Sequence, residues 1–181
     1  MGNLNIADVF GVNMVLQRDS PIKFWGTCAA NAVVTAEIGG REVTVNAKAE
    51  LWTIVFPPMG AERGLELIIT AHTNLGIEKA IIKNICIGEV WIAGGQSNME
   101  FPLRCDADRE AALKHADNSD IRFYTVPRIT YPGQDREEEI HFRNGKWRVS
   151  TQSNALDCSA AGFYFALQIN KSLNVPVGII C

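Results

Sequence analysis

Apolar and polar side chains alternate over the first part of the chain with the two-residue period of a β-strand. The segments "PIKFWGTC" (21–28) and "LWTIVFPP" (51–58) each predict one half-buried strand, and the two prolines end the second because proline has no N–H to donate into a ladder. The alternation puts Phe24 and Trp25 on opposite faces, so we expect at least one of them to be exposed.

Two longer segments of the same region predict hairpins. "AVVTAEIGGREVTVNAK" (32–48) has Gly39-Gly40 at its centre, and glycine readily adopts the positive φ of tight hairpin turns. "LELIITAHTNLGIEKAIIKNI" (65–85) repeats this plan with a bend at residues 74–76. Short strands with frequent turns predict an all-β, jelly-roll-like sandwich.

The pattern changes after Ile85. "IGEVWIAGG" (87–95) and "IRFYTVP" (121–127) are almost continuously apolar, as expected of parallel strands that are covered on both faces. "SAAGFYFALQINKSL" (159–173) predicts a helix, and "VPVGIIC" (175–181) predicts a further buried strand. Strand, helix and strand in this order predict a right-handed parallel α/β sheet.

The predicted helix has recognisable ends. Ser159 is a suitable N-cap, Asn174 can end the helix, and Pro176 cannot extend it. Its expected apolar stripe consists of Phe163, Leu167, Ile169 and Leu173. A short helix is also expected within residues 107–115.

These patterns predict two domains, 1–84 and 85–181. The second has too few strands and helices for a doubly wound sheet with both faces buried, and the sequence ends within an apolar strand. We therefore expect it to be the first part of a larger domain, whose remainder is absent or on another chain.

The composition of the chain argues against some classes of partner. The chain has 181 residues, 47% hydrophobic and 20% charged, and a net charge of only −3 with scattered Lys and Arg, which argues against a nucleic-acid partner. Charges interrupt the apolar runs before they reach the length of a membrane span, so no membrane partner is expected. Since no signal peptide is visible, a cytoplasmic location is favoured, with secretion or a periplasmic location open if a signal was removed.

The cysteines and histidines do not suggest a metal site. The five cysteines form no C-x-x-C pair and lie mostly in apolar or small-residue stretches, which favours buried free thiols. The three histidines share no i, i+4 spacing and do not pair with a nearby cysteine. We expect neither a metal nor another cofactor.

Candidate chemistry lies in "GEVWIAGGQSNMEFPL" (88–103), where an apolar strand stops at Gly94-Gly95 and Ser97 follows. The carboxyl end of a parallel strand is where α/β proteins bind ligands. A serine on that turn would expose its hydroxyl, and its N–H could meet the oxyanion of an acyl-transfer intermediate. Glycine, serine and asparagine are also common turn residues, and Met99 replaces the last glycine of a G-x-S-x-G elbow.

A nucleophilic serine also needs a base, and none is evident. Asp106 and Asp108 follow Ser97 closely, but a solvated helix start explains them equally well. We expect His115 and His141 to be surface or packing residues. The sequence therefore contains no recognisable complete triad.

Three segments together carry a family resemblance. "GEVWIAGGQSNMEFPL" resembles the first conserved block of the SGNH-hydrolase superfamily, in the Gly-Gln-Ser-Asn form of the sialate O-acetylesterases and related carbohydrate acetylesterases. "NMVLQRDSPIKFWGTC" (13–28) resembles the start of that family's N-terminal β-domain, and residues 159–180 resemble the helix and strand that lead to its second block. The order of the three segments matches the N-terminal portion of the family.

The resemblance implies a fold and a site. The fold would be the β-sandwich followed by the first part of an α/β/α, flavodoxin-like SGNH domain. Ser97 would be the nucleophile, with Gly95, Gln96 and Asn98 completing the turn and supporting the oxyanion. The family's acid and base come from an Asp-x-x-His motif, which is expected beyond residue 181.

The implied function is a serine esterase that removes O-acetyl groups from carbohydrates, with O-acetylated sialic acid as the first expected substrate, through an acetyl-Ser97 intermediate. This chain alone would be inactive, and its partner would be the missing C-terminal part or a complementary chain. An acetylxylan-type esterase is an alternative.

A non-catalytic carbohydrate-binding or assembly fragment is the other alternative. Aromatic residues of the β-region could stack on sugars, although core packing or contact with the catalytic domain is favoured for them. These residues are Phe24, Trp25, Trp52 and Phe56.

Overall fold

The computed structural model describes residues 4–127 and 145–181. The fold is mostly β, as predicted, and the chain forms two compact units, residues 1–88 (unit 1) and 89–181 (unit 2). The expected boundary after residue 84 falls inside strand β8 (Gly76–Ile92), which continues from one unit into the other.

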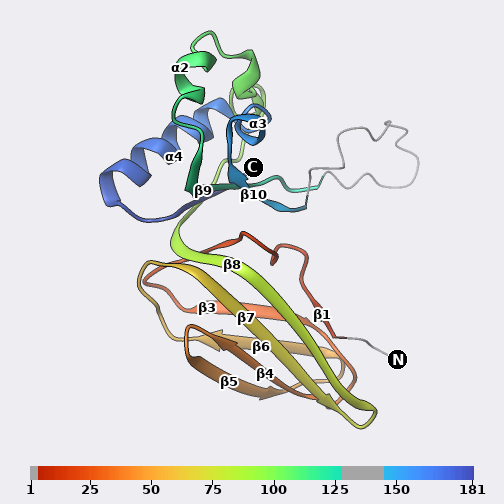
Figure 1. Ribbon diagram of the computed structural model, residues 1–181. Coiled ribbons are helices and arrows are strands. Elements are labelled where there is room, and N and C mark those ends of the chain that lie inside the picture. The colour runs from red at the N-terminus through yellow and green to blue at the C-terminus, as the bar shows by residue number, and fades with distance from the viewer. Residues whose placement is uncertain (1–3, 128–144) are drawn as a thin grey trace, which may run out of the picture. The chain divides into compact units, whose positions relative to one another are not determined.

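Unit 1 contains two sets of paired strands (Figure 1). One is the antiparallel sheet of β1 (Asn5–Ile6), β3 (Ile22–Thr27) and β6 (Leu51–Phe56). The other joins β8, β7 (Glu62–Thr73), β4 (Val33–Ile38) and β5 (Arg41–Asn46) in antiparallel order. The short strand β2 (Val15–Gln17) pairs in parallel with β8.

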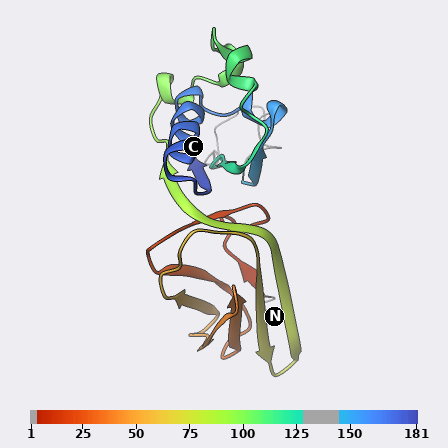
Figure 2. The ribbon, with the colours of Figure 1, turned by 60° about the vertical axis from the view of Figure 1, so that its left-hand side comes forward.

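Both predicted hairpins are confirmed. Gly39 and Gly40 connect β4 to β5 with φ of +55° and +69°, the pair of positive angles that a two-residue type I′ turn requires. β7 and β8 run side by side and turn at residues 74–75, where the Thr73 hydroxyl accepts a hydrogen bond from the Leu75 N–H (Figure 2).

The core of unit 1 follows from the alternation. In β3, Ile22 and Phe24 are buried while Lys23 and Trp25 are exposed, which confirms the predicted separation of Phe24 from Trp25. Strands β6, β4 and β7 contribute further buried residues to unit 1. They are Trp52, Ile54, Phe56, Val34, Ala36, Ile38, Leu65, Leu67, Ile69 and Ala71.

The sheet of unit 2 is only partly parallel. Strand β11 (Val177–Ile180) pairs in parallel with β9 (Asn118–Tyr124) on one side and with the last four residues of β8 on the other. Strand β10 (Trp147–Ser150) adds an antiparallel pair to β9, which the expectation of a parallel sheet missed. Four residues are too short a stretch to show a periodic pattern.

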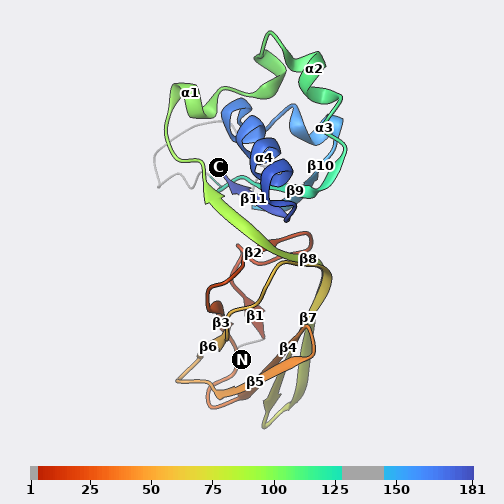
Figure 3. The same cartoon turned by 90° about the vertical axis from the view of Figure 1, so that its left-hand side faces the viewer.

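Helix α4 (Ala160–Leu173) covers one face of this sheet (Figure 3). Its predicted ends are confirmed, because Ser159 Oγ accepts a hydrogen bond from the Gly162 N–H and Asn174 closes the helix in the left-handed conformation. The predicted stripe is wrong at Leu173, which is 46% exposed. Leu173 is the last residue of the helix, where Asn174 already turns the chain away in the left-handed conformation.

Shorter helical pieces connect β8 to β9 and β10 to α4. They are α1 (Ser97–Glu100), a single 3₁₀ turn (Leu103–Cys105), α2 (Arg109–Leu113) and α3 (Gln152–Ala155). The second core consists of residues from these pieces, from α4 and from the sheet, including Leu103, Ile121, Phe123, Phe163 and Ile179. In the described residues, no helix has both the length and the apolar character to cross a membrane.

Candidate active site

Ser97 is the first residue of α1, just beyond the end of β8 (Figure 3). The last sheet hydrogen bond before it joins the Ala93 N–H to the Ile180 carbonyl at 2.8 Å. The chain then leaves the sheet through Gly94 and Gly95. Ser97 therefore follows the carboxyl end of a strand that pairs in parallel with β11.

Gly95 and Gln96 lead from the strand into α1, and the chain bends at Gln96. A Cβ atom at position 95 would lie 3.0 Å from Met99 Cβ, so a side chain there would force its neighbour to move. The Gln96 carbonyl accepts a hydrogen bond from the Glu100 N–H at 2.8 Å, which closes the single turn of α1. Small size at Gly95 is therefore a local steric requirement.

The segment after Ser97 is fixed to the start of α4 by backbone hydrogen bonds. The Ala160 N–H donates to the Phe101 carbonyl at 2.9 Å, and the Leu103 N–H donates to the Cys158 carbonyl at 3.0 Å. Ser159 Oγ, the N-cap of α4, lies 3.6 Å from Met99 Sδ. These contacts hold the C-terminal side of the turn whose first residue is Ser97.

The Ser97 side chain itself is exposed, and in the described part of the chain its hydroxyl makes no hydrogen bond. Gln96 and Asn98 are exposed beside it. The N–H groups at the very start of a helix, here those of Ser97 and Asn98, precede the first intrahelical hydrogen bond and can bind an anion. A free hydroxyl beside such N–H groups has the elements of a nucleophile with an oxyanion donor.

The structure brings no base to Ser97 within the residues it describes. His115 is exposed and follows α2, and His141 lies outside the described residues. Asp106 instead accepts a hydrogen bond from the Tyr164 hydroxyl, and this bond raises the pKa of Tyr164 to about 12. Asp108 precedes α2 without a side-chain capping bond.

Sequence reasoning missed two contacts that hold the region around the turn. The Tyr164–Asp106 hydrogen bond joins α4 to the segment before α2. An ion pair between Arg104 and Asp157 joins the 3₁₀ turn to the residues before α4. Their partners are separated by more than fifty positions, so no local pattern could identify them.

The described residues contain buried thiols but no cluster of metal ligands. No cluster of three or more His, Cys, Asp or Glu side chains that could hold a metal ion occurs there. Cys28, Cys86 and Cys158 are buried free cysteines, and burial is the main cause that raises the pKa of Cys28 and Cys158.

Comparison with known proteins agrees with the family predicted from the sequence. No family model matches the chain. The sialate O-acetylesterase of Rattus norvegicus is 26% identical over 188 residues, which are 92% of this chain and 33% of that protein. The Homo sapiens sialate O-acetylesterase is 26% identical over 184 residues, 93% of this chain and 34% of that protein.

A solved structure is similar over almost the whole chain. It is a carbohydrate acetylesterase from Xanthomonas citri, with a TM-score of 0.84 and 30% sequence identity over 97% of this chain and 39% of that one. Compared with the curated sialate O-acetylesterases that it matches, this chain spans about a third of their length. The predicted resemblance to a portion of the sialate O-acetylesterases and related carbohydrate acetylesterases is confirmed.

Proposed function

We propose that this chain is the nucleophile-bearing part of a carbohydrate O-acetylesterase, with Ser97 as the nucleophile. The observation that carries the proposal is the exposed Ser97 hydroxyl on a tightly held turn that follows the end of β8. Similarity to acetylesterases over more than nine tenths of the chain supports the substrate class.

In the proposed reaction, Ser97 Oγ attacks the acetyl carbonyl carbon while a base takes its proton. The developing oxyanion would accept hydrogen bonds from the Ser97 N–H, supported by the turn of Gly95, Gln96 and Asn98. The ester bond to the sugar then breaks, and the sugar hydroxyl leaves with the proton held by the base. Water hydrolyses the acetyl-Ser97 ester in the second half of the reaction.

The base would come from a C-terminal part of the same protein or from a complementary chain. General-base catalysis typically contributes a factor of about 10² to 10⁴, and one oxyanion donor contributes about 10² to 10³. Without those groups, residues 1–181 would have almost no esterase activity. In this proposal unit 1 is a jelly-roll-like β-sandwich and unit 2 is the first part of an SGNH domain.

O-acetylated sialic acid is the first proposed substrate, supported by the names of the curated relatives. An acetylated plant polysaccharide is the second, since the structural neighbour is named only as a carbohydrate acetylesterase. Acetate release from each substrate by the longer protein that carries this chain would discriminate between them.

Labelling with a fluorophosphonate tests the nucleophile. In the longer protein, we expect the label on Ser97, and Ser97→Ala should lose the label and at least about a thousandfold of the acetate release from a chromogenic acetyl ester. Ser172→Ala is the matched control, because Ser172 is an exposed serine on α4 whose hydroxyl accepts a hydrogen bond from the exposed Gln168. Label on another serine, or full activity of Ser97→Ala, would refute the assignment.

The inactivity of the short chain is tested separately. Residues 1–181 should release acetate no faster than buffer, and addition of the remaining part should restore turnover. Turnover by the short chain at the rate of the longer protein would contradict this second part without affecting the choice of Ser97.

A further inference from the structure

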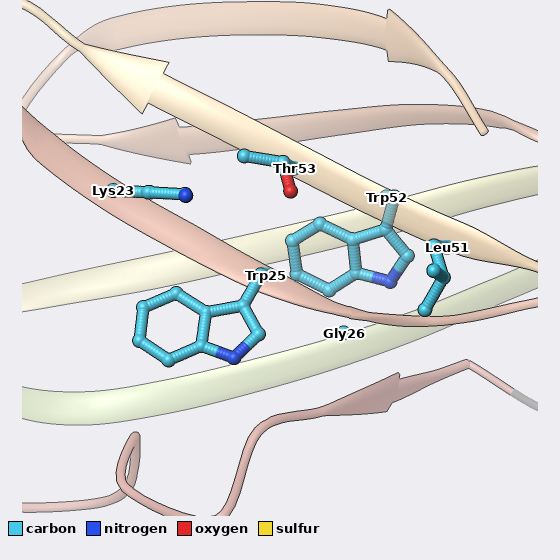
Figure 4. Close-up of a pocket in the computed structure, with 6 residues that line it drawn as sticks. All are labelled: Lys23, Trp25, Gly26, Leu51, Trp52 and Thr53. Carbon is cyan, nitrogen blue, oxygen red and sulfur yellow. The ribbon is translucent and has the colours of Figure 1, made fainter. Parts of the chain in front are cut away.

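The outer face of the β1–β3–β6 sheet carries a second candidate site, far along the sequence from Ser97. It is a pocket of about 310 Å³ (Figure 4). Its lining residues all belong to β3 and β6: Lys23, Trp25, Gly26, Leu51, Trp52 and Thr53.

Trp25 provides a flat aromatic surface in this pocket. Its side chain is 42% exposed, whereas its neighbour Phe24 is completely buried. The edge-to-face contact with Phe10, with ring centroids 4.6 Å apart, supports the indole from one side. An exposed indole that is already held by a neighbour loses little conformational entropy when a ligand stacks on it.

Gly26 lies next to Trp25, where the structure is too closely packed for a side chain. A Cβ atom at this position would lie 2.0 Å from the Asn5 carbonyl oxygen and 2.7 Å from the Trp52 ring, so any side chain would clash. The Trp52 indole N–H donates a hydrogen bond to the Thr27 carbonyl at 3.2 Å. Trp52 is held in place but is only 2% exposed, so it offers a ligand almost no surface, and Trp25 is the aromatic residue available for stacking.

Polar groups stand beside the aromatic surface. Thr53 is directly opposite Trp25 in the β3–β6 ladder, and Lys23 precedes Trp25 by two residues on the same face. Lys23 forms no ion pair with any side chain in the part of the chain that the structure describes. Its positive charge disfavours a cationic ligand and favours a carboxylate.

We propose that this pocket binds an acidic carbohydrate. The face of an indole is the negative part of its quadrupole, so it attracts the weakly positive C–H groups on one face of a pyranose ring. The Thr53 hydroxyl and the Trp25 N–H are available for sugar hydroxyls, and the Lys23 ammonium group is placed for a carboxylate. The site requires neither Ser97 nor any residue outside unit 1.

The test is binding of sialyllactose and trigalacturonic acid to residues 1–181, with lactose as the neutral counterpart of sialyllactose. Titration calorimetry should detect binding of at least one acidic probe. The chain should bind lactose several-fold more weakly. Trp25→Ala should lower the affinity for the acidic probe by about five- to tenfold, as loss of one aromatic contact does. Lys23→Gln should reduce the preference for the acidic probe over lactose.

Two control variants separate this site from folding and from the proposed active site. Trp91→Ala removes a tryptophan of similar exposure, 45%, from unit 2, and Ser97→Ala removes the proposed nucleophile. Both should bind the acidic probes like the original chain, with thermal unfolding used to verify that each variant is folded. Failure of both acidic probes to bind, equal affinity for lactose, or unchanged binding by Trp25→Ala would overturn the proposal.

Discussion

The two units of the chain bury their strands in different ways. In unit 1, β6 buries every second residue and exposes those between them, and β3 does the same from Ile22 to Trp25. In unit 2, β9 buries four consecutive residues, Ile121 to Tyr124, and β11 buries Val177 to Ile179. The buried run in β9 includes Arg122, whose Nε donates a hydrogen bond to the Ser119 carbonyl at 3.2 Å.

This difference in burial follows from how the strands are paired and how many of their faces are covered. The hairpins of unit 1 pair neighbours in sequence, and only one face of each strand meets the core. In unit 2, β11 pairs Ile180 with Ile92, so residues near the two ends of the unit meet in one sheet. Alternation thus accompanies antiparallel strands with one face on the core, including the long-range pair of β3 and β6, and continuous burial accompanies the parallel pairs of β11.

The largest predicted effect tests the alternation in unit 1. Phe24→Ala should lower the free energy of unfolding by about 3–5 kcal/mol, because a completely buried ring leaves a cavity. Trp25→Ala, on the next residue, should cost less, about 1–2 kcal/mol, since 42% of the residue is already exposed. Urea denaturation of the whole chain measures both.

Unit 2 offers the matched comparison on α4. Phe163 is completely buried and Phe165 is 39% exposed, so Phe163→Ala should cost several-fold more stability than Phe165→Ala. Equal losses of stability for the two phenylalanine variants, or for Phe24→Ala and Trp25→Ala, would show that exposure does not separate the inner and outer positions.

Much of the fold could be predicted from the sequence, because local patterns determine it. The Gly39-Gly40 turn, the alternation in β3 and both ends of α4 depend only on neighbouring residues, and all were predicted. Strand β10 and the exposure of Leu173 were not predicted. They depend on which distant element packs against them, and that information is not present in a short window of sequence.

The candidate site also has features that the sequence predicts and features that it does not. The exposed turn at Ser97 follows from an apolar strand that ends at two glycines, which is a local signal. The fixing of that turn against residues 156–160, and the Tyr164–Asp106 hydrogen bond, join positions that are distant in sequence. The sequence could therefore suggest the nucleophile, whereas the contacts that support its turn became evident only in three dimensions.

A smaller effect is expected at the junction between α4 and β11. Asn174 has φ of +54°, and its N–H donates to the Asn170 carbonyl at 2.8 Å. Asn174→Ala should lower the free energy of unfolding by about 1 kcal/mol, because alanine tolerates the left-handed conformation poorly. Asn174→Gly should leave stability unchanged or slightly raised, and equal losses for the two variants would contradict a backbone cause.

The smallest effect concerns the hydrogen bond from Tyr164 to Asp106, on the surface of unit 2. Tyr164→Phe should cost less than about 1 kcal/mol at pH 8, since water competes for an exposed hydrogen bond.

Because the bond raises the pKa of Tyr164 to about 12, against about 10 for an unfolded chain, the folded state favours the protonated phenol. Its contribution to stability is complete below pH 10 and is lost as the pH rises from about 10 to 12. The free-energy difference between the original chain and Tyr164→Phe should therefore shrink over this range in urea denaturation. A difference that stays constant from pH 8 to pH 12 would mean that the Tyr164 proton is not held by Asp106 in solution.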